Sequence, residues 1–357
     1  MDNTNQKKAL INGEIGLFIR GLIIGKVLTL MVIGGLLWWL LKPNLLSRNS
    51  VNSSNQNLNS PSSTASTFQT VTDVPNASFN YGGSTAWASI RQLVDSQIQS
   101  DRPELQLRYV NPVSGSPGSS SGIRMLLDGK IDFAQSSRPL TDEEQAMAKE
   151  RGFTLEQRQV GMDGVAVVVN PSLNVPGLTV DQLQQIYLGK ITNWNQVGGP
   201  NLPITPLSQR PEDADTVIFP SNSNLKGQAF GSNVQYVYSS TEAVRQLSKT
   251  PGSVYYASAR SVLPQCSVKA LPLGSTSGQL IAPYREPLVS PEQCLRQRNQ
   301  LNTQAIKNGS YPLIANLFVI IKQNKGREQQ IGDAYAKLLL TDEGQRAIEQ
   351  AGFVAVR

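Results

Sequence analysis

The chain has 357 residues, of which 39% are hydrophobic, a formal net charge of +6 and no histidine. Without histidine, Ser-His-Asp and Cys-His triads and nearly all zinc chemistry are excluded; Asp, Glu, Lys or Ser-Lys mechanisms stay possible, so an enzyme is disfavoured. Residues 1–70 carry six Lys/Arg against two Asp/Glu. The remainder is therefore nearly balanced in charge and lacks a nucleic-acid-binding footprint. We expect no metal and no cofactor.

The N-terminal segment contains an apolar run suited to a membrane. Val27–Leu41 is uncharged, and together with residues 21–26 it would span about 31 Å as a helix, enough for a bilayer if Lys26 lies at the interface. More basic residues precede the run than closely follow it, which predicts a cytoplasmic N-terminus and a body on the periplasmic side. We expect residues 1–46 to hold an uncleaved anchor. A cleaved signal peptide is the alternative, but no A-x-A site follows the run.

Residues 47–74 are the predicted linker between this anchor and a folded body. They are dominated by Ser, Asn, Thr and Gln, with almost no apolar content to bury, which is typical of a flexible tether. The chain's two cysteines, Cys266 and Cys294, both lie in the body at residues 75–357. In an oxidising compartment they permit one disulfide, and we expect it to form, although their spacing does not show that they are close.

The body alternates predicted strands and predicted helices. Strands are expected at residues 78–81, 105–109, 131–134, 165–169, 204–207, 254–256 and 313–321. Helices are expected at residues 87–98, after residue 122, after the capping boxes at 141–144 and 179–182, and at 327–350. This alternation predicts an α/β architecture with mainly parallel sheets. The length of the body favours two lobes.

Gly115–Glu144 is the most informative segment. Ser119–Gly122 precede an i, i+3, i+4 apolar set, and Ser136 and Ser137 follow a short strand and lead into the next helix. A helix start leaves N–H groups without partners and carries partial positive charge, so two such starts with hydroxyl groups favour a bound anion. The alternative is that GSPGSSSG is a flexible surface loop.

Six blocks of the sequence, in this order, resemble the phosphate-binding proteins of ABC transporters: GSSSGI, DGKIDFAQSSRPLTDEE, IYLGKITNWNQVGG, PGSVYYASA, YPLIANLFVII and LLLTDEGQRAIEQAGFV. The resemblance implies the type II periplasmic-binding-protein fold, an α/β fold of two lobes with mainly parallel sheets that are joined by two crossovers. Residues 75–170 and 310–357 would form one lobe and residues 171–309 the other. The crossovers would lie near Val168–Pro171 and Tyr311–Ala315.

The resemblance also implies a phosphate site made by four loops. Backbone N–H groups, hydroxyls and one guanidinium would supply the donors that a dehydrated phosphate needs. Ser120 is the best match to the family's binding serine, and for Arg210 the alternative is a surface cation. The site residues implied are Ser84, Thr85 and Ala86 in the first loop, Ser119 and Ser120 in the second, Ser137 in the third, and Arg210, Asp215 and Thr216 in the fourth.

Two positions depart from the family's pattern. The third loop usually carries a carboxylate that accepts the proton of a protonated phosphate, and Ser137 stands there instead. The fourth loop usually reads Ser-Gly-Thr after the arginine, whereas here it reads Ala214-Asp215-Thr216. Either Asp215 replaces the missing acceptor and disfavours sulfate, which has no proton to donate, or it repels the anion. Arg138 could compensate if it turned into the cleft.

The function implied is a membrane-tethered, non-catalytic solute-binding protein that captures inorganic phosphate for an ABC permease of the inner membrane. Two alternatives stay open. The chain could be a degenerate family member that acts as a tethered sensor or adaptor, or it could bind another oxyanion such as sulfate or arsenate. A serine hydrolase is a further class, but the sequence has neither G-x-S-x-G nor S-x-x-K at a strand-to-helix turn.

Overall fold

The computed structural model describes residues 66–357 except 211–214, 217 and 220–227. The predicted anchor lies outside the described residues. Among the helices that are described, none combines the length and the apolar character that a membrane span needs. The last residues of the predicted linker, in contrast, are packed against the body: Phe68 is fully buried, and its N–H donates to a carboxylate oxygen of Glu343 at 2.8 Å. The folded body therefore includes residues before position 75.

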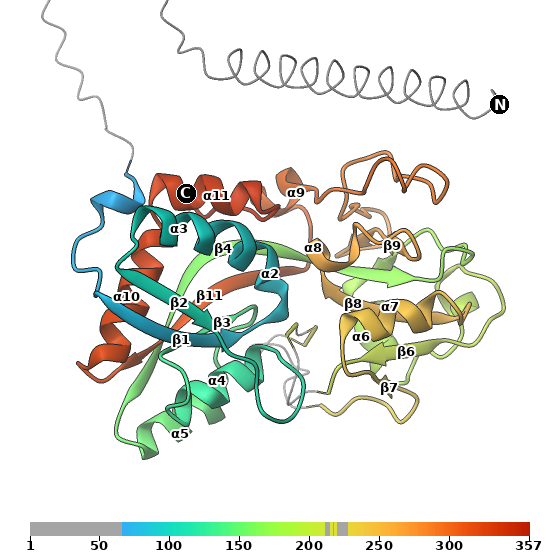
Figure 1. Cartoon of the computed structure of the whole chain (residues 1–357). Helices are drawn as coiled ribbons and strands as arrows, with labels where there is room; N and C mark the ends of the chain where they lie inside the picture. Colours follow the sequence, from blue (N-terminus) through green and yellow to red (C-terminus); the bar gives the residue numbers. More distant parts are fainter. Residues whose placement is uncertain (1–65, 211–214, 217, 220–227) are drawn as a thin grey trace, which may run out of the picture. The chain divides into compact units, whose positions relative to one another are not determined.

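Two sheets that share one long strand form the frame of this body (Figure 1). The strand order is β2-β1-β3-β11-β4-β8-β6-β7, with β9 also paired to β4, and β5 pairs separately with β10. The strands are β1 (Ala77–Gly83), β2 (Leu105–Tyr109), β3 (Phe133–Ser136), β4 (Thr154–Val169), β5 (Leu178–Thr179), β6 (Thr205–Ser208), β7 (Gln235–Tyr236), β8 (Ser253–Ser258), β9 (Lys269–Leu271), β10 (Leu273–Gly274) and β11 (Ile314–Gln323).

The shared strand β4 carries the chain from one sheet to the other. Its residues 154–164 pair with β11, whereas Val165–Val169 pair with β8 and β9 and lie in the second hydrophobic core. The chain thus changes sheets between Gly164 and Val165, before the predicted crossover near Val168–Pro171. The predicted first lobe included these valines. No turn marks the change, because the strand continues through it, and the sequence therefore carries no sign of it.

The second crossover lies in β11. Leu313 and Ala315 belong to the second core and Leu317 belongs to the first, so the chain returns at the end of the predicted segment Tyr311–Ala315. All pairings of β4 and β11 are antiparallel, whereas β1 with β2 and β3, and β6 with β7 and β8, are parallel. The two sheets therefore share the same plan, with parallel strands on the outside and the crossing strands beside them.

Helices cover both faces of the first sheet (Figure 1). Along β11, Leu317, Val319 and Ile321 face one core and Phe318 and Ile320 face another, the alternation expected of a strand buried on two sides. The described helices and helical turns are η1 (Phe68–Thr70), η2 (Thr85–Trp87), α2 (Ala88–Ile90), η3 (Arg91–Asp95), α3 (Ser96–Asp101), α4 (Ser119–Leu127), α5 (Asp142–Glu150), α6 (Val180–Tyr187), η4 (Trp194–Val197), α7 (Ser240–Leu247), α8 (Ala259–Val262), α9 (Thr303–Lys307), α10 (Arg327–Leu339) and α11 (Asp342–Gln350).

The predicted α/β alternation is confirmed, with two differences in the elements. The helix expected at residues 327–350 is divided into α10 and α11, because Thr341 has an extended conformation and its hydroxyl caps the N–H of Gly344 at 3.0 Å. The strand expected at residues 131–134 begins two residues later, at Phe133. The predicted capping boxes of α5 and α6 are both present.

The predicted disulfide between Cys266 and Cys294 is confirmed, and their Cα atoms are 5.5 Å apart.

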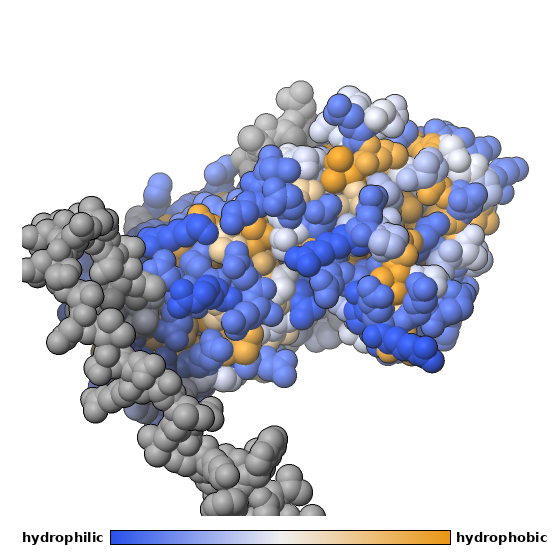
Figure 2. Space-filling model, turned by 90° about the horizontal axis from the view of Figure 1, so that it is seen from above, coloured by the Kyte–Doolittle hydropathy of each residue, from blue (hydrophilic) through white to orange (hydrophobic). Residues whose placement is uncertain are grey.

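Apolar residues are concentrated in the cores, and Figure 2 shows mainly polar residues on one face, with apolar residues in small groups between them.

Asp163 is a buried carboxyl group at the crossover in β4. It accepts hydrogen bonds from the Ser258 hydroxyl and from the N–H of Gly164, the latter at 2.8 Å. Burial nevertheless raises the pKa of Asp163 from its ordinary 3.8 to about 7. The folded state therefore holds the Asp163 proton more tightly than the unfolded state does. This tighter proton binding stabilises the fold fully below about pH 4, and the stabilisation is lost as pH rises toward 7.

We therefore expect the free energy of unfolding to fall between pH 5 and pH 8 by a larger amount in the wild type than in Asp163→Asn. The asparagine has nearly the same shape and does not ionise. Its oxygen can still accept from Gly164, and its NH2 group can donate to the Ser258 hydroxyl, so the titration is removed while both contacts are kept. Chemical denaturation of both proteins at the two pH values measures the difference. An identical pH dependence in the two proteins would show that Asp163 keeps an ordinary pKa in the folded state.

Candidate functional site

Two helix starts converge where β1 and β3 end. η2 begins directly after β1, and α4 packs its first turn against the same strand end. This approach depends on two glycines. A Cβ on Gly122 would lie 2.3 Å from the Cα of Gly83, and Gly83 itself has φ +123° with the carbonyl oxygen of Gln135 in the place of a Cβ. The glycines therefore allow the free N–H groups of η2 and α4 to face the same point.

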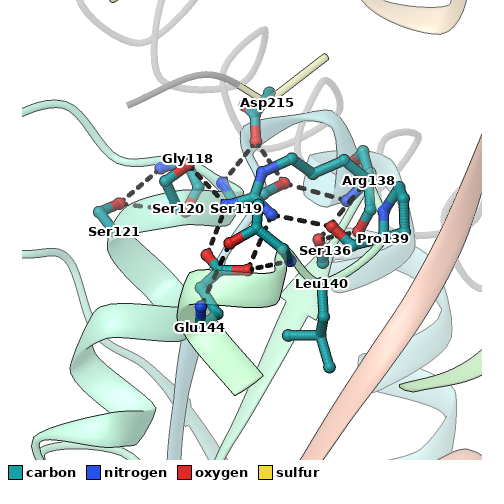
Figure 3. A network of polar contacts seen from close by, with 12 residues as sticks. Gly118, Ser119, Ser120, Ser121, Ser136, Arg138, Pro139, Leu140, Glu144 and Asp215 are labelled. Atoms are coloured by element: carbon teal, nitrogen blue, oxygen red, sulfur yellow. Dashed lines mark hydrogen bonds and ion pairs between the residues drawn. The ribbon is translucent and has the colours of Figure 1, made fainter. Parts of the chain in front are cut away.

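A carboxylate from the other lobe occupies that point. One oxygen of Asp215 accepts hydrogen bonds from the N–H of Thr85, at 3.0 Å, and from the Thr85 hydroxyl. The other oxygen accepts from the N–H of Ser119 at 2.8 Å and from its hydroxyl at 3.1 Å. Figure 3 shows Asp215 directed at the start of α4, and the residue is only 5% exposed. Both carboxylate oxygens are thus satisfied by neutral donors of the first lobe.

A second layer of hydroxyl groups holds these donors in place. The Ser119 hydroxyl accepts from the N–H of Ser137 at 3.0 Å while it donates to Asp215. The hydroxyls of Ser137 and Ser84 share a hydrogen bond of 2.5 Å, and Ser84 accepts from the N–H of Ala86 at 3.2 Å. Ser84, Ser119 and Ser137 are all buried. The predicted first, second and third loops are therefore brought together by direct contacts.

Ser120 and Arg138 belong to a different contact. The Arg138 guanidinium is buried, and its two terminal nitrogens lie 2.6 and 3.0 Å from the carboxylate oxygens of Glu144. It also donates to the Ser120 hydroxyl at 2.7 Å (Figure 3). Arg138 is therefore held by Glu144 and Ser120, and a compensating role for it in the cleft stays a prediction. Ser119 rather than Ser120 contacts the carboxylate.

Arg210 lies apart from this cluster. It is exposed, and its guanidinium carbon lies 5.2 Å from the centroid of the Tyr236 ring, a cation–π distance. It is not among the described residues that line the two cavities of the cleft. Its predicted contact with a ligand therefore stays a prediction.

Two cavities share Thr85 in the cleft, and the smaller of them is lined by Asp215. The smaller holds about 10 Å³ and is lined by Ala86, Asp215 and Thr216 together with Tyr255 and Tyr256 of β8. The larger holds about 310 Å³ and is lined mainly by polar side chains. Thr85 and Gln209 line both cavities. Sequence patterns did not identify Gln209 or the tyrosines of β8, because nothing in their local pattern distinguishes a cleft from a core.

The donors of Thr85 and Ser119, held by Ser84 and Ser137, are suited to binding one oxyanion group. These donors are backbone N–H groups and hydroxyls, and among the described residues there is no group of three or more acidic, cysteine or histidine side chains that could hold a metal ion. An acid or phosphate oxygen is the natural partner of two adjoining helix starts. The carboxylate of Asp215 demonstrates this preference within the chain itself.

The chain is similar to known proteins over most of this body. The model of the PBP superfamily domain matches residues 62–343. The phosphate-binding protein PstS of Staphylococcus epidermidis is 25% identical over 280 residues, which cover 76% of this chain and 77% of the relative. PstS of Staphylococcus haemolyticus is 25% identical over 283 residues, covering 76% of this chain and 79% of that protein.

Two solved structures share the fold. The first is a proposed phosphate ABC transporter substrate-binding protein of Clostridium perfringens with bound phosphate (TM-score 0.59, 20% identity, 79% of this chain and 100% of that one). The second is an ABC-type phosphate transport receptor of Vibrio cholerae (TM-score 0.55, 22% identity, 78% of this chain and 100% of that one). The predicted type II periplasmic-binding-protein fold is confirmed.

Proposed function

The chain belongs to the PBP superfamily, and on this premise we propose that it is a solute-binding protein that captures inorganic phosphate for an ABC-type transporter. The observation that carries the proposal is the set of donors from Thr85 and Ser119, which converge on an anionic group between the lobes. Relatives named as phosphate-binding proteins match most of the chain, which supports phosphate as the anion. The proposal is of binding without catalysis.

Phosphate would bind where the carboxylate of Asp215 now lies. Two of its oxygens would accept from the N–H and hydroxyl groups of Thr85 and Ser119. The N–H of Ser137 would hold the Ser119 hydroxyl, and the Ser84 hydroxyl would hold that of Ser137. Ala86 and Thr216 line the adjoining cavity and would close around the ligand. A contact from Arg210 stays a prediction, because it requires this side chain to leave Tyr236.

We further propose that residues 21–41 tether the protein to the membrane with the body on the outer side. The apolar run and the excess of basic residues before it support this orientation. The permease would then receive phosphate from a protein that cannot diffuse away. Sequencing the mature N-terminus of the exported protein tests the tether, because a terminus near residues 45–70 would mean that the segment is cleaved.

A second candidate function is a tethered sensor or adaptor that acts through its surface without a small ligand. The position of Asp215 favours this candidate, because the carboxylate already satisfies the donors that a ligand would need. The two candidates differ in a simple observable. A solute-binding protein takes up one phosphate saturably, whereas the adaptor takes up none.

We expect the full-length protein to bind inorganic phosphate with a stoichiometry of one, without turnover, and to bind sulfate more weakly. Once it has been displaced from the donors of Thr85 and Ser119, the Asp215 carboxylate can accept a hydrogen bond from a protonated phosphate, whereas sulfate near neutral pH has no proton to offer. Isothermal titration calorimetry with each anion, in matched buffers, measures both affinities. The absence of phosphate uptake at millimolar concentration would favour the adaptor, and equal affinities would contradict the role of the carboxylate in selectivity.

A further inference from the structure

The Asp215 carboxylate caps two helices to which it does not belong. Thr85 and Ser119 are the first residues of η2 and α4, so their N–H groups have no partner inside their own helix. The residue before α4 is Gly118, which has no side chain that could cap it. A negative group at such a position is favoured by the partial positive charge of the helix start. Asp215 supplies this group from the other lobe.

The contact has the form expected of a bound ligand. Each carboxylate oxygen receives one N–H and one hydroxyl, four hydrogen bonds in all. A buried carboxylate with no such donors would be strongly destabilising, so these bonds are needed to keep Asp215, at 5% exposure, in place. The same donors are the ones that phosphate would need.

The space beside Asp215 excludes simultaneous binding. The adjoining cavity of about 10 Å³ holds at most one water molecule, and phosphate is several times larger. Phosphate can approach through the larger cavity, which shares Thr85, but it can reach Ser119 only after the carboxylate has moved. Occupation by Asp215 and occupation by phosphate are therefore mutually exclusive.

We infer that Asp215 is an intramolecular ligand, which occupies the oxyanion site and links the two lobes when no external anion is bound. Phosphate then binds by displacing the carboxylate, so that its apparent affinity is set by competition within the chain. The occupation of the site by Asp215 is independent of the proposed function, whereas its displacement by phosphate rests on that function. The sequence suggested that Asp215 would face the ligand as an acceptor; in this structure it stands in the ligand's place.

Amide hydrogen exchange of the full-length protein tests the inference directly. In the absence of phosphate, the N–H groups of Thr85 and Ser119 should exchange at least about tenfold more slowly in the wild type than in Asp215→Ala. The reason is that one charge-assisted hydrogen bond contributes about 1.5 kcal/mol or more. Asp215→Asn keeps the side-chain size and should give the same direction. Asp181→Asn, which removes an exposed carboxylate of the same lobe, should leave both amides protected.

Exchange in the core strands β3 and β8 reports whether each variant is folded. Unprotected Thr85 and Ser119 amides in the wild type, or unchanged protection in folded Asp215→Ala, would overturn the inference. Phosphate added to Asp215→Ala separates the two proposals. If phosphate restores the protection of the Thr85 and Ser119 amides, both Asp215 as an intramolecular ligand and phosphate capture are supported. If these amides lose protection in Asp215→Ala and phosphate does not change this, the intramolecular ligand is supported and phosphate capture is contradicted.

Discussion

Replacing Asp215 with glycine is expected to raise the affinity for inorganic phosphate about 10- to 100-fold. In the wild type, phosphate must displace a carboxylate that holds four hydrogen bonds, whereas in the variant the same donors are free. After displacement, the carboxylate can accept one hydrogen bond from a protonated phosphate, which replaces only one of the four hydrogen bonds that it gave up. One or two charge-assisted hydrogen bonds, at about 1.5 kcal/mol each, correspond to this range. Calorimetric titration measures it.

The same titration with sulfate separates the two roles of Asp215. If the carboxylate also disfavours an anion without a proton, Asp215→Gly should bind sulfate with an even larger gain than phosphate. Asp181→Asn controls for the general loss of one negative charge on this lobe. Weaker phosphate binding by Asp215→Gly would mean that the side chain acts chiefly as an acceptor for the bound ligand and does not compete with it.

Replacing Glu144 with alanine is expected to lower the free energy of unfolding by about 3–5 kcal/mol. The substitution leaves the guanidinium of Arg138 buried without its partner, a loss of this size in other buried ion pairs. It also removes the acceptor of the N–H of Thr141 at the start of α5, which is bound at 2.9 Å. Chemical denaturation measures the change.

The matched control for Glu144→Ala is Glu150→Ala, at the exposed end of the same helix. That substitution should change stability by less than about 0.5 kcal/mol. Because Arg138 also donates to Ser120, next to Ser119, Glu144→Ala should additionally weaken phosphate binding. A stability loss similar to that of Glu150→Ala would show that the Arg138–Glu144 pair is not held in the folded state as described.

The features that the sequence predicted well are those fixed by local chemistry. The capping boxes of α5 and α6 and the serine-rich start of α4 depend on residues within one turn of each other. The grouping of Thr85, Ser119 and Ser137 in one site is instead implied by the resemblance to the phosphate-binding proteins, because these residues lie in loops that are distant in the sequence. The pairing of the two cysteines required one further argument, from the compartment, because their spacing alone does not imply contact.

The features that the sequence did not reveal depend on contacts between distant segments. Val165–Val169 form an uninterrupted apolar run, which indicates a strand buried on both faces but does not say in which lobe it lies. The partner of Arg138 was ambiguous for the same reason, since Glu144 and an anion satisfy a guanidinium equally well. Asp215 is the clearest case: its departure from the family's pattern was visible, but its position on the donors of the other lobe was not.

The most direct test of this account is a double-mutant cycle in phosphate affinity between Asp215→Gly and Thr85→Val. In the wild type, removing the Thr85 hydroxyl weakens both the internal carboxylate and phosphate, so the net change should be small. With Asp215→Gly, the same substitution weakens phosphate alone and should lower its affinity about tenfold. Equal effects of Thr85→Val in the two backgrounds would contradict the claim that carboxylate and phosphate compete for one set of donors.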